Sequence, residues 1–123
     1  MATKKRIPLV DHHVLHDLED DLQDPMSARD FARDFVRAWD DKYHRLETAV
    51  CVHDQPAALD AVLSVKITAV MVGAPRLAKS AIELERRIRK GDMRSSEEAL
   101  ENIHTCGDET MQELMTTYLN RET

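Results

Sequence analysis

Six histidines and two cysteines are the side chains of this chain best suited to metal binding or nucleophilic chemistry. His12 and His16 are four residues apart, with Glu19 and Asp20 one turn later, a helical spacing that suits zinc or nickel. This segment is acidic and exposed in pattern, and two imidazoles without a buried third ligand hold a metal weakly. We therefore expect a solvated acidic helix here and no bound metal.

The remaining reactive side chains form no catalytic set. Cys51 and Cys106 fit neither a zinc-ligand spacing nor a disulfide framework, so both are expected to be buried, reduced thiols. The sequence contains no G-x-S-x-G motif, no glycine-rich phosphate loop and no catalytic cysteine–histidine pattern. We therefore expect a protein that is not an enzyme and that needs no cofactor.

Length and composition indicate one helical domain in the cytoplasm. The chain has 123 residues, 42% hydrophobic and 33% charged, with only 3 Gly and 4 Pro to form turns. Its net charge of −6 argues against a nucleic-acid partner, which requires a basic face. No apolar run reaches the roughly 18 residues of a membrane span, and the basic residues 4–6 precede no signal-peptide core.

Hydrophobic spacing and turn residues divide the chain into a short helix and four longer ones. We expect a flexible tail over residues 1–9 and a single domain over residues 10–123. The expected helices, in order, cover residues 11–24, 25–52, 56–72, 75–90 and 95–118. Short connections favour antiparallel neighbours, so the predicted fold is all-α, an up-down-up-down four-helix bundle with a short N-terminal helix.

Particular residues set the expected boundaries and core. Asp11 can cap the first helix, Gly73 and Pro75 separate the third from the fourth, and Ser95 with Glu98 forms a capping-box pattern. Gly107 should weaken the last helix by about 1 kcal/mol relative to alanine. One apolar stripe is expected in the core: Phe31, Phe35, Trp39, Tyr43, Leu46 and Val50. The last helix carries the apolar residues Leu100, Ile103, Met111, Leu114, Met115 and Tyr118.

A series of short motifs resembles one known family. The motifs are Lys66, Gly73-Ala74, Leu77, Leu84-Glu85 and Gly91-Asp92. In this order and spacing they are similar to the histidine-containing phosphotransfer (HPt) domains of bacterial phosphorelays, over roughly residues 8–120. In such domains a histidine takes a phosphoryl group from one aspartate and passes it to another. The resemblance implies an HPt-like bundle and a role in two-component signalling.

The phosphoacceptor motif of that family is degenerate here. It reads H-x-L-K-G-[SA]-[SA]-x-x-x-G-[AL] and falls on residues 63–74 of this chain. Leu63 stands at the histidine position, Lys66 is retained, and Ile67 replaces the glycine that lets a receiver domain's acidic pocket approach the imidazole. Leucine has no nitrogen to attack phosphorus, so the resemblance implies a member that cannot carry a phosphoryl group at this position.

The same analogy assigns the two sides of the third helix. Val62, Val65, Ala69, Val72 and Leu77 should face the core. Leu63, Ile67, Val70 and Met71 should lie on or near the outward face, where adjacent large apolar side chains suggest a partner surface. A different helical register, or coverage by the first helix, would remove this surface.

Two functions fit this face. In the first, the protein is a phosphotransfer-incompetent adaptor or competitor, a pseudo-HPt, that binds a receiver domain or a histidine kinase through Leu63, Lys66, Ile67, Val70 and Met71. Lys66 would then pair with the receiver's acidic pocket, or it is simply a solvated lysine. In the second, the face forms a homodimer without a phosphorelay role. A third reading, phosphorylation of His44, His53 or His104, lacks the surrounding motif.

Overall fold

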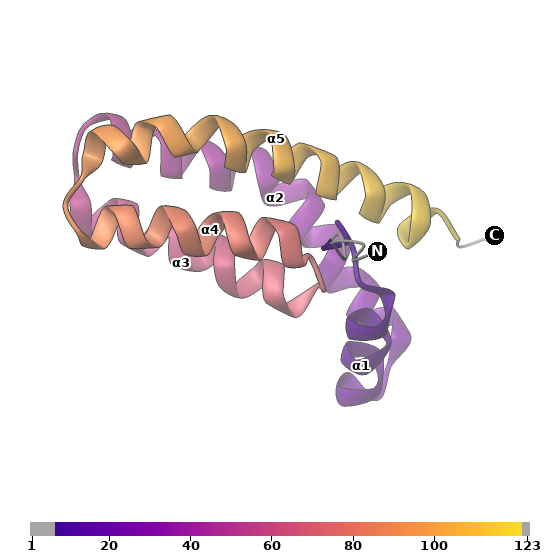
Figure 1. The fold of residues 1–123 in the computed structure, drawn as a ribbon. Helices are drawn as coiled ribbons and strands as arrows, with labels where there is room; N and C mark the ends of the chain where they lie inside the picture. The colour runs from indigo at the N-terminus through magenta and orange to yellow at the C-terminus, as the bar shows by residue number, and fades with distance from the viewer. Residues whose placement is uncertain (1–6, 122–123) are drawn as a thin grey trace, which may run out of the picture.

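The computed structural model describes residues 7–121, which form an all-α fold (Figure 1). Its elements are α1 (His12–Leu22), α2 (Pro25–Cys51), α3 (Gln55–Met71), α4 (Pro75–Arg89), α5 (Met93–Thr117) and the 3₁₀ turn η1 (Leu119–Arg121). No strand occurs in this part of the chain, which confirms the predicted all-α class. Most of the expected tail, residues 1–6, lies outside the described residues.

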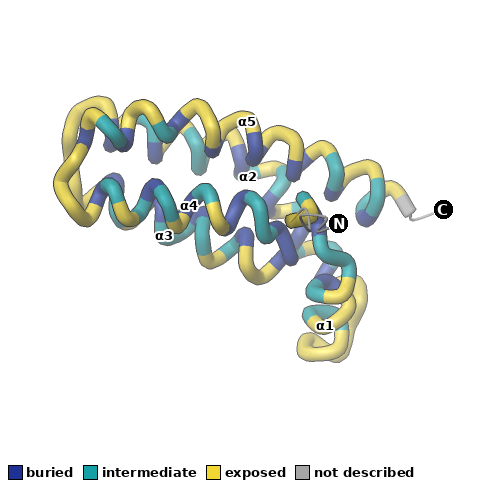
Figure 2. The backbone as a smooth tube through the Cα atoms, in the orientation of Figure 1, coloured by how far each residue is buried: buried dark blue, intermediate teal, exposed yellow. Residues whose placement is uncertain are grey.

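The four long helices surround one core. α2 contacts α3, α3 contacts α4, α4 contacts α5, and α5 contacts α2. The connections over residues 52–54, 72–74 and 90–92 are short, so the chain reverses direction between consecutive helices (Figure 1). α1 lies across one end and packs mainly against α2. Buried residues line the inner sides of the helices, as Figure 2 shows. None of the described helices combines the length and apolarity that crossing a bilayer requires.

Aspartate side chains cap most of the helix starts. Their carboxylates accept hydrogen bonds from free backbone N–H groups of the first turn, in α1, α2, α3 and α5. In α5 the cap is Asp92, whose Oδ1 accepts from the Ser95 N–H at 3.0 Å. The predicted capping box of Ser95 and Glu98 is therefore wrong, because Ser95 already lies inside the first turn.

The core contains most of the predicted stripe positions. Phe35, Trp39, Leu46 and Val50 are buried, whereas Phe31 and Tyr43 are partly buried at its edge. One expectation is wrong: Cys51 is exposed at the end of α2, although Cys106 is buried as expected. On α5, Met115 is also exposed.

Gly107 of α5 lies directly against the Trp39 ring of α2. A Cβ atom built on Gly107 would lie 1.8 Å from Trp39 Cζ2, far inside van der Waals contact. Beside it, the indole Nε1–H of Trp39 donates to Asp108 Oδ1 at 2.8 Å. The predicted role of Gly107 as a weak point is therefore wrong: its missing side chain makes room for the tryptophan ring.

The N-terminal segment is attached to the turn that ends α3. Gly73 has a φ of +73°, and its carbonyl accepts a hydrogen bond from the Asp11 N–H at 2.6 Å. A Cβ atom at Gly73 would lie 2.6 Å from the Asp11 carbonyl oxygen. Val10 is buried in the core, and the Ile7 carbonyl accepts from Arg76. Residues 7–11 thus pack against the α3–α4 end of the domain.

Candidate partner-binding surface on α3

Apolar side chains occupy both sides of α3. Those predicted to face the core are all buried: Val62, Val65, Ala69, Val72 and Leu77. On the opposite side, Ile67 and Val70 are each 56% exposed and Met71 is 42% exposed, while Leu63 is partly buried. The predicted orientation of α3 is therefore confirmed, and three large apolar side chains face solvent.

The first helix does not cover this face. Val14 of α1 reaches the C-terminal end of α3, where it lines an apolar groove of about 320 Å³ together with Val70, Ala78 and Ile82. Ile82, on α4, is itself 48% exposed. The apolar surface thus continues from α3 onto α4.

Lys66 forms an ion pair within the domain. Its Nζ lies 2.7 Å from Oε1 of Glu85 on α4, and Arg89 Nε lies 2.8 Å from the other carboxylate oxygen. The Glu85 side chain is only 13% exposed. The hydrogen bonds from Lys66 and then Arg89 hold the pKa of Glu85 below its usual value. Sequence reasoning missed this pair because it depends on how α3 and α4 are aligned.

Replacing Glu85 with glutamine should remove an acid-sensitive part of the protein's stability. A carboxyl group with a depressed folded-state pKa stabilises the fold above its unfolded pKa, near 4.5, and this contribution is lost as pH falls through the folded pKa. The variant should be less stable than the wild type by about 1 kcal/mol at pH 7, with a gap that narrows as the pH falls below about 4.5. Urea midpoints between pH 3 and 7 measure the gap, and a pH-independent gap would contradict the assignment.

A polar hollow lies beside the apolar side chains, between α2 and α3. It has a volume of about 470 Å³ and is lined by Lys42, Arg45, Asp60, Ala61, Leu63, Ser64 and Ile67. Lys42 Nζ donates to Ser64 Oγ at 2.8 Å, which places the ammonium group next to Leu63. Nothing in the sequence indicated this hollow, because Lys42 and Arg45 fall on the charged face of α2.

The histidines of the described chain are not arranged as a metal site. His12 Nε2 lies 3.2 Å from Thr117 Oγ1, and His16 Nδ1 lies 3.5 Å from Glu19 Oε1. Among the residues that the structure describes, no three His, Cys, Asp or Glu side chains are placed to hold a metal ion.

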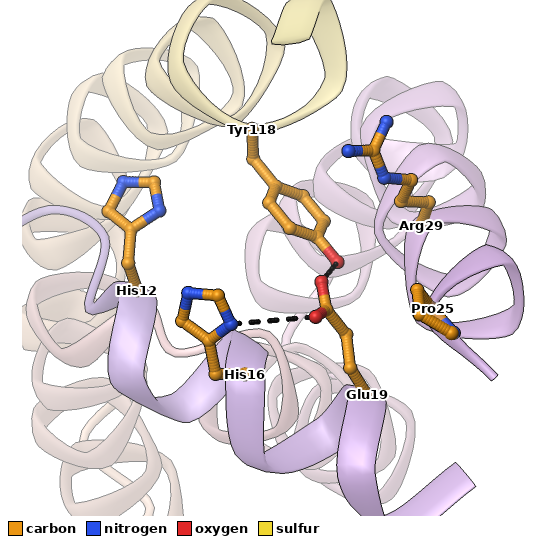
Figure 3. A pocket seen from close by; sticks show the side chains of 6 residues that line it. All are labelled: His12, His16, Glu19, Pro25, Arg29 and Tyr118. Carbon is orange, nitrogen blue, oxygen red and sulfur yellow. Dashed lines mark hydrogen bonds and ion pairs between the residues drawn. The ribbon is translucent and has the colours of Figure 1, made fainter. Parts of the chain in front are cut away.

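A pocket lies between α1 and the C-terminal end of the domain (Figure 3), and its lining includes His12, His16 and Glu19. The Tyr118 hydroxyl donates to Glu19 Oε2 at 2.7 Å, and the guanidinium carbon of Arg29 lies 5.6 Å from the Tyr118 ring centre. Burial raises the pKa of Tyr118, and the hydrogen bond to Glu19 raises it further. Glu19 thus connects α1 to the end of α5 through its hydrogen bond with Tyr118.

Three other histidines lie next to carboxylates. His44 is 3.9 Å from Glu47, His53 is 3.4 Å from Glu97 and His104 is 3.5 Å from Asp108. The His104 ring also stacks on Tyr43, with ring centres 4.2 Å apart. The neighbouring carboxylates would repel the negative charge of a phosphoryl group on any of these three histidines, which argues against their phosphorylation.

Comparison with known proteins identifies the fold. No family model matches the sequence, and no curated protein is significantly similar to it. Among solved structures, histidine-containing phosphotransfer protein B (HptB) from Pseudomonas aeruginosa PAO1 superposes with a TM-score of 0.83. The match covers 95% of this chain and 100% of that chain, at 20% sequence identity. The chain therefore has the fold of a histidine-containing phosphotransfer protein, as the motif order in its sequence predicted.

Proposed function

We propose that this protein is a pseudo-HPt, a signalling adaptor or competitor that binds a receiver domain or a histidine kinase without carrying a phosphoryl group. The proposal includes an up-down-up-down arrangement of α2–α5, which their contacts and short connections support. The observation that carries it is the pairing of Leu63 and Ile67 at the motif's histidine and glycine positions, within an HPt fold.

Two features support the loss of phosphotransfer. Leu63 offers no nucleophilic nitrogen, and Ile67, 56% exposed, fills the space that glycine would leave one turn further along the helix. Four of the six histidines are also poorly placed to replace the missing one. His16, His44, His53 and His104 each lie within 4 Å of a carboxylate oxygen, which would repel a phosphoryl group.

The exposed apolar side chains support a retained docking function. Complete burial of Ile67, Val70 or Met71, which are already about half buried, contributes about 1 kcal/mol each before the costs of association. A surface of this kind on a small domain is typical of a protein–protein contact. Because the docking of an HPt-like domain uses helix faces, it does not require an imidazole.

Replacing Ile67 with glutamate tests the proposal. The variant should lose affinity for its partner by at least about 100-fold, because the substitution removes an apolar contact and places a carboxylate in the interface, where its desolvation is costly. Met115→Glu is the matched control, since Met115 is also a large, exposed apolar residue but lies on α5. Binding is measured by calorimetry against purified receiver domains and kinase dimerisation domains from the source organism, after circular dichroism has shown that both variants are folded.

The results distinguish the proposed function from the homodimer alternative. Partner binding that survives in Met115→Glu and is lost in Ile67→Glu supports the pseudo-HPt function. Equal binding by both variants contradicts the assigned surface. If no receiver or kinase domain binds, and the wild type forms a concentration-dependent dimer that Ile67→Glu abolishes, the homodimer replaces the signalling function.

A further inference from the structure

The hollow beside Leu63 and Ile67 carries charge of the opposite sign to the chain as a whole. The protein has a net charge of −6, yet the charged side chains lining this hollow are Lys42 and Arg45 against the single carboxylate of Asp60. A net positive patch on an acidic protein attracts an acidic partner surface and repels a basic one.

The cations of this hollow are available, unlike the lysine that the motif retains. Lys66 is neutralised by Glu85 at 2.7 Å, within a pair whose carboxylate is largely buried. Lys42 contacts the neutral hydroxyl of Ser64, and within the described residues neither Lys42 nor Arg45 forms an ion pair. The positive charge that a partner meets next to the apolar side chains is therefore that of α2, not that of Lys66.

We propose that this surface binds an acidic pocket of a receiver domain, whose carboxylates contact Lys42 and Arg45 while apolar side chains around the pocket pack on Leu63 and Ile67. The inference rests on the proposed function and specifies its partner, its cationic residues and the exclusion of Lys66 from the contact.

Charge also argues against a second copy of the chain as the occupant. In a two-fold symmetric dimer the same patch lies on both sides of the interface. Each copy would then bring Lys42 and Arg45 toward a surface of the same net charge, with Asp60 as the one compensating carboxylate in the hollow. A receiver pocket supplies the negative charge that the symmetric arrangement lacks.

A double charge reversal, Lys42→Glu with Arg45→Glu, tests the inference. It should weaken binding to the receiver domain selected by the wild type at least about tenfold, and should flatten the decline of affinity with added salt. The matched control is Lys90→Glu with Arg94→Glu, which changes the net charge equally at the turn between α4 and α5. Lys66→Met should leave the affinity within about twofold of wild type, after circular dichroism has shown all variants to be folded.

Each outcome decides the inference. Weakening in the α2 double variant, with near wild-type binding by the control and by Lys66→Met, supports it. If Ile67→Glu abolishes receiver binding but the α2 double variant does not, the inference fails and the proposed function stands. Equal weakening by the control double variant, or a large loss in Lys66→Met, also overturns it. If the wild type binds no receiver domain even at low salt, the inference fails. Binding to a kinase domain would still leave the proposed function in place. Binding to neither class of domain would overturn the inference and the proposed function together.

Discussion

Gly107→Ala should destabilise the protein by about 3 kcal/mol, although alanine is the better helix former. The added methyl group would lie 1.8 Å from Trp39 Cζ2, 2.3 Å from Cη2 and 2.5 Å from Cε2. The ring is held on one side by the core and on the other by the hydrogen bond from its Nε1 to Asp108, so it cannot move aside freely. The overlap therefore outweighs a propensity gain of about 1 kcal/mol.

Guanidinium unfolding monitored by circular dichroism measures this effect, with Gly91→Ala as the control. Gly91 has a φ of +76° and nothing within 4 Å of an added Cβ, so its substitution should cost only the backbone strain, about 1 kcal/mol. Repeating Gly107→Ala in a Trp39→Phe background should reduce its cost, because the smaller ring leaves space. A stabilising Gly107→Ala, or a cost unchanged by Trp39→Phe, would show that the contact is not responsible.

Leu63→His combined with Ile67→Gly should allow the protein to accept a phosphoryl group at position 63, where the proposed function has none accepted. Position 63 is partly exposed beside Lys42 and Ser64, so an imidazole placed there can reach solvent and a partner. Its nitrogen would attack the phosphorus of a receiver's acyl phosphate; the new N–P bond forms as the P–O bond breaks, and the aspartate carboxylate leaves. Glycine at 67 removes the side chain that blocks this approach, at a cost of about 1 kcal/mol in helix stability.

The single variant Leu63→His is the informative control. It should accept little phosphate, because the exposed Ile67 side chain still holds the phosphorylated aspartate of a docked receiver out of reach of the imidazole. Adding Glu85→Gln to the double variant should raise the transfer rate, since Lys66 would then be free to offset the phosphoryl charge. Acid-labile label transferred from a phosphorylated receiver provides the measurement. Equal labelling of the single and double variants would contradict the blocking role of Ile67.

Features that depend on one helix at a time were predictable from the sequence. The spacing of apolar residues gave the helix ranges to within a few residues, and the motif order gave the orientation of α3, with Val65 inward and Ile67 outward. Local signals compete at boundaries, however: Asp92 and Ser95 are both good caps, and only the backbone geometry shows that Asp92 is used.

Features that depend on two helices were not predictable. The pairing of Lys66 with Glu85, the hollow containing Lys42, and the contact of Gly107 with Trp39 each join residues that are far apart in the chain. From sequence alone, a glycine inside a helix indicates only a lower helix propensity. Its second effect, making room for a side chain of another helix, can be predicted only when that neighbouring side chain is known. The charged part of the candidate surface was missed for the same reason.

The position of Trp39 has an optical consequence. It is the single tryptophan of the chain, and its ring is buried against Gly107, where α2 meets α5. Loss of the fold exposes this indole to water, so its emission should shift to longer wavelength on unfolding. The outward side of α3 contains no tryptophan, so a partner that docks there without a tryptophan of its own should leave the emission nearly unchanged. Intrinsic fluorescence thus separates loss of folding from loss of docking in every variant above that retains Trp39.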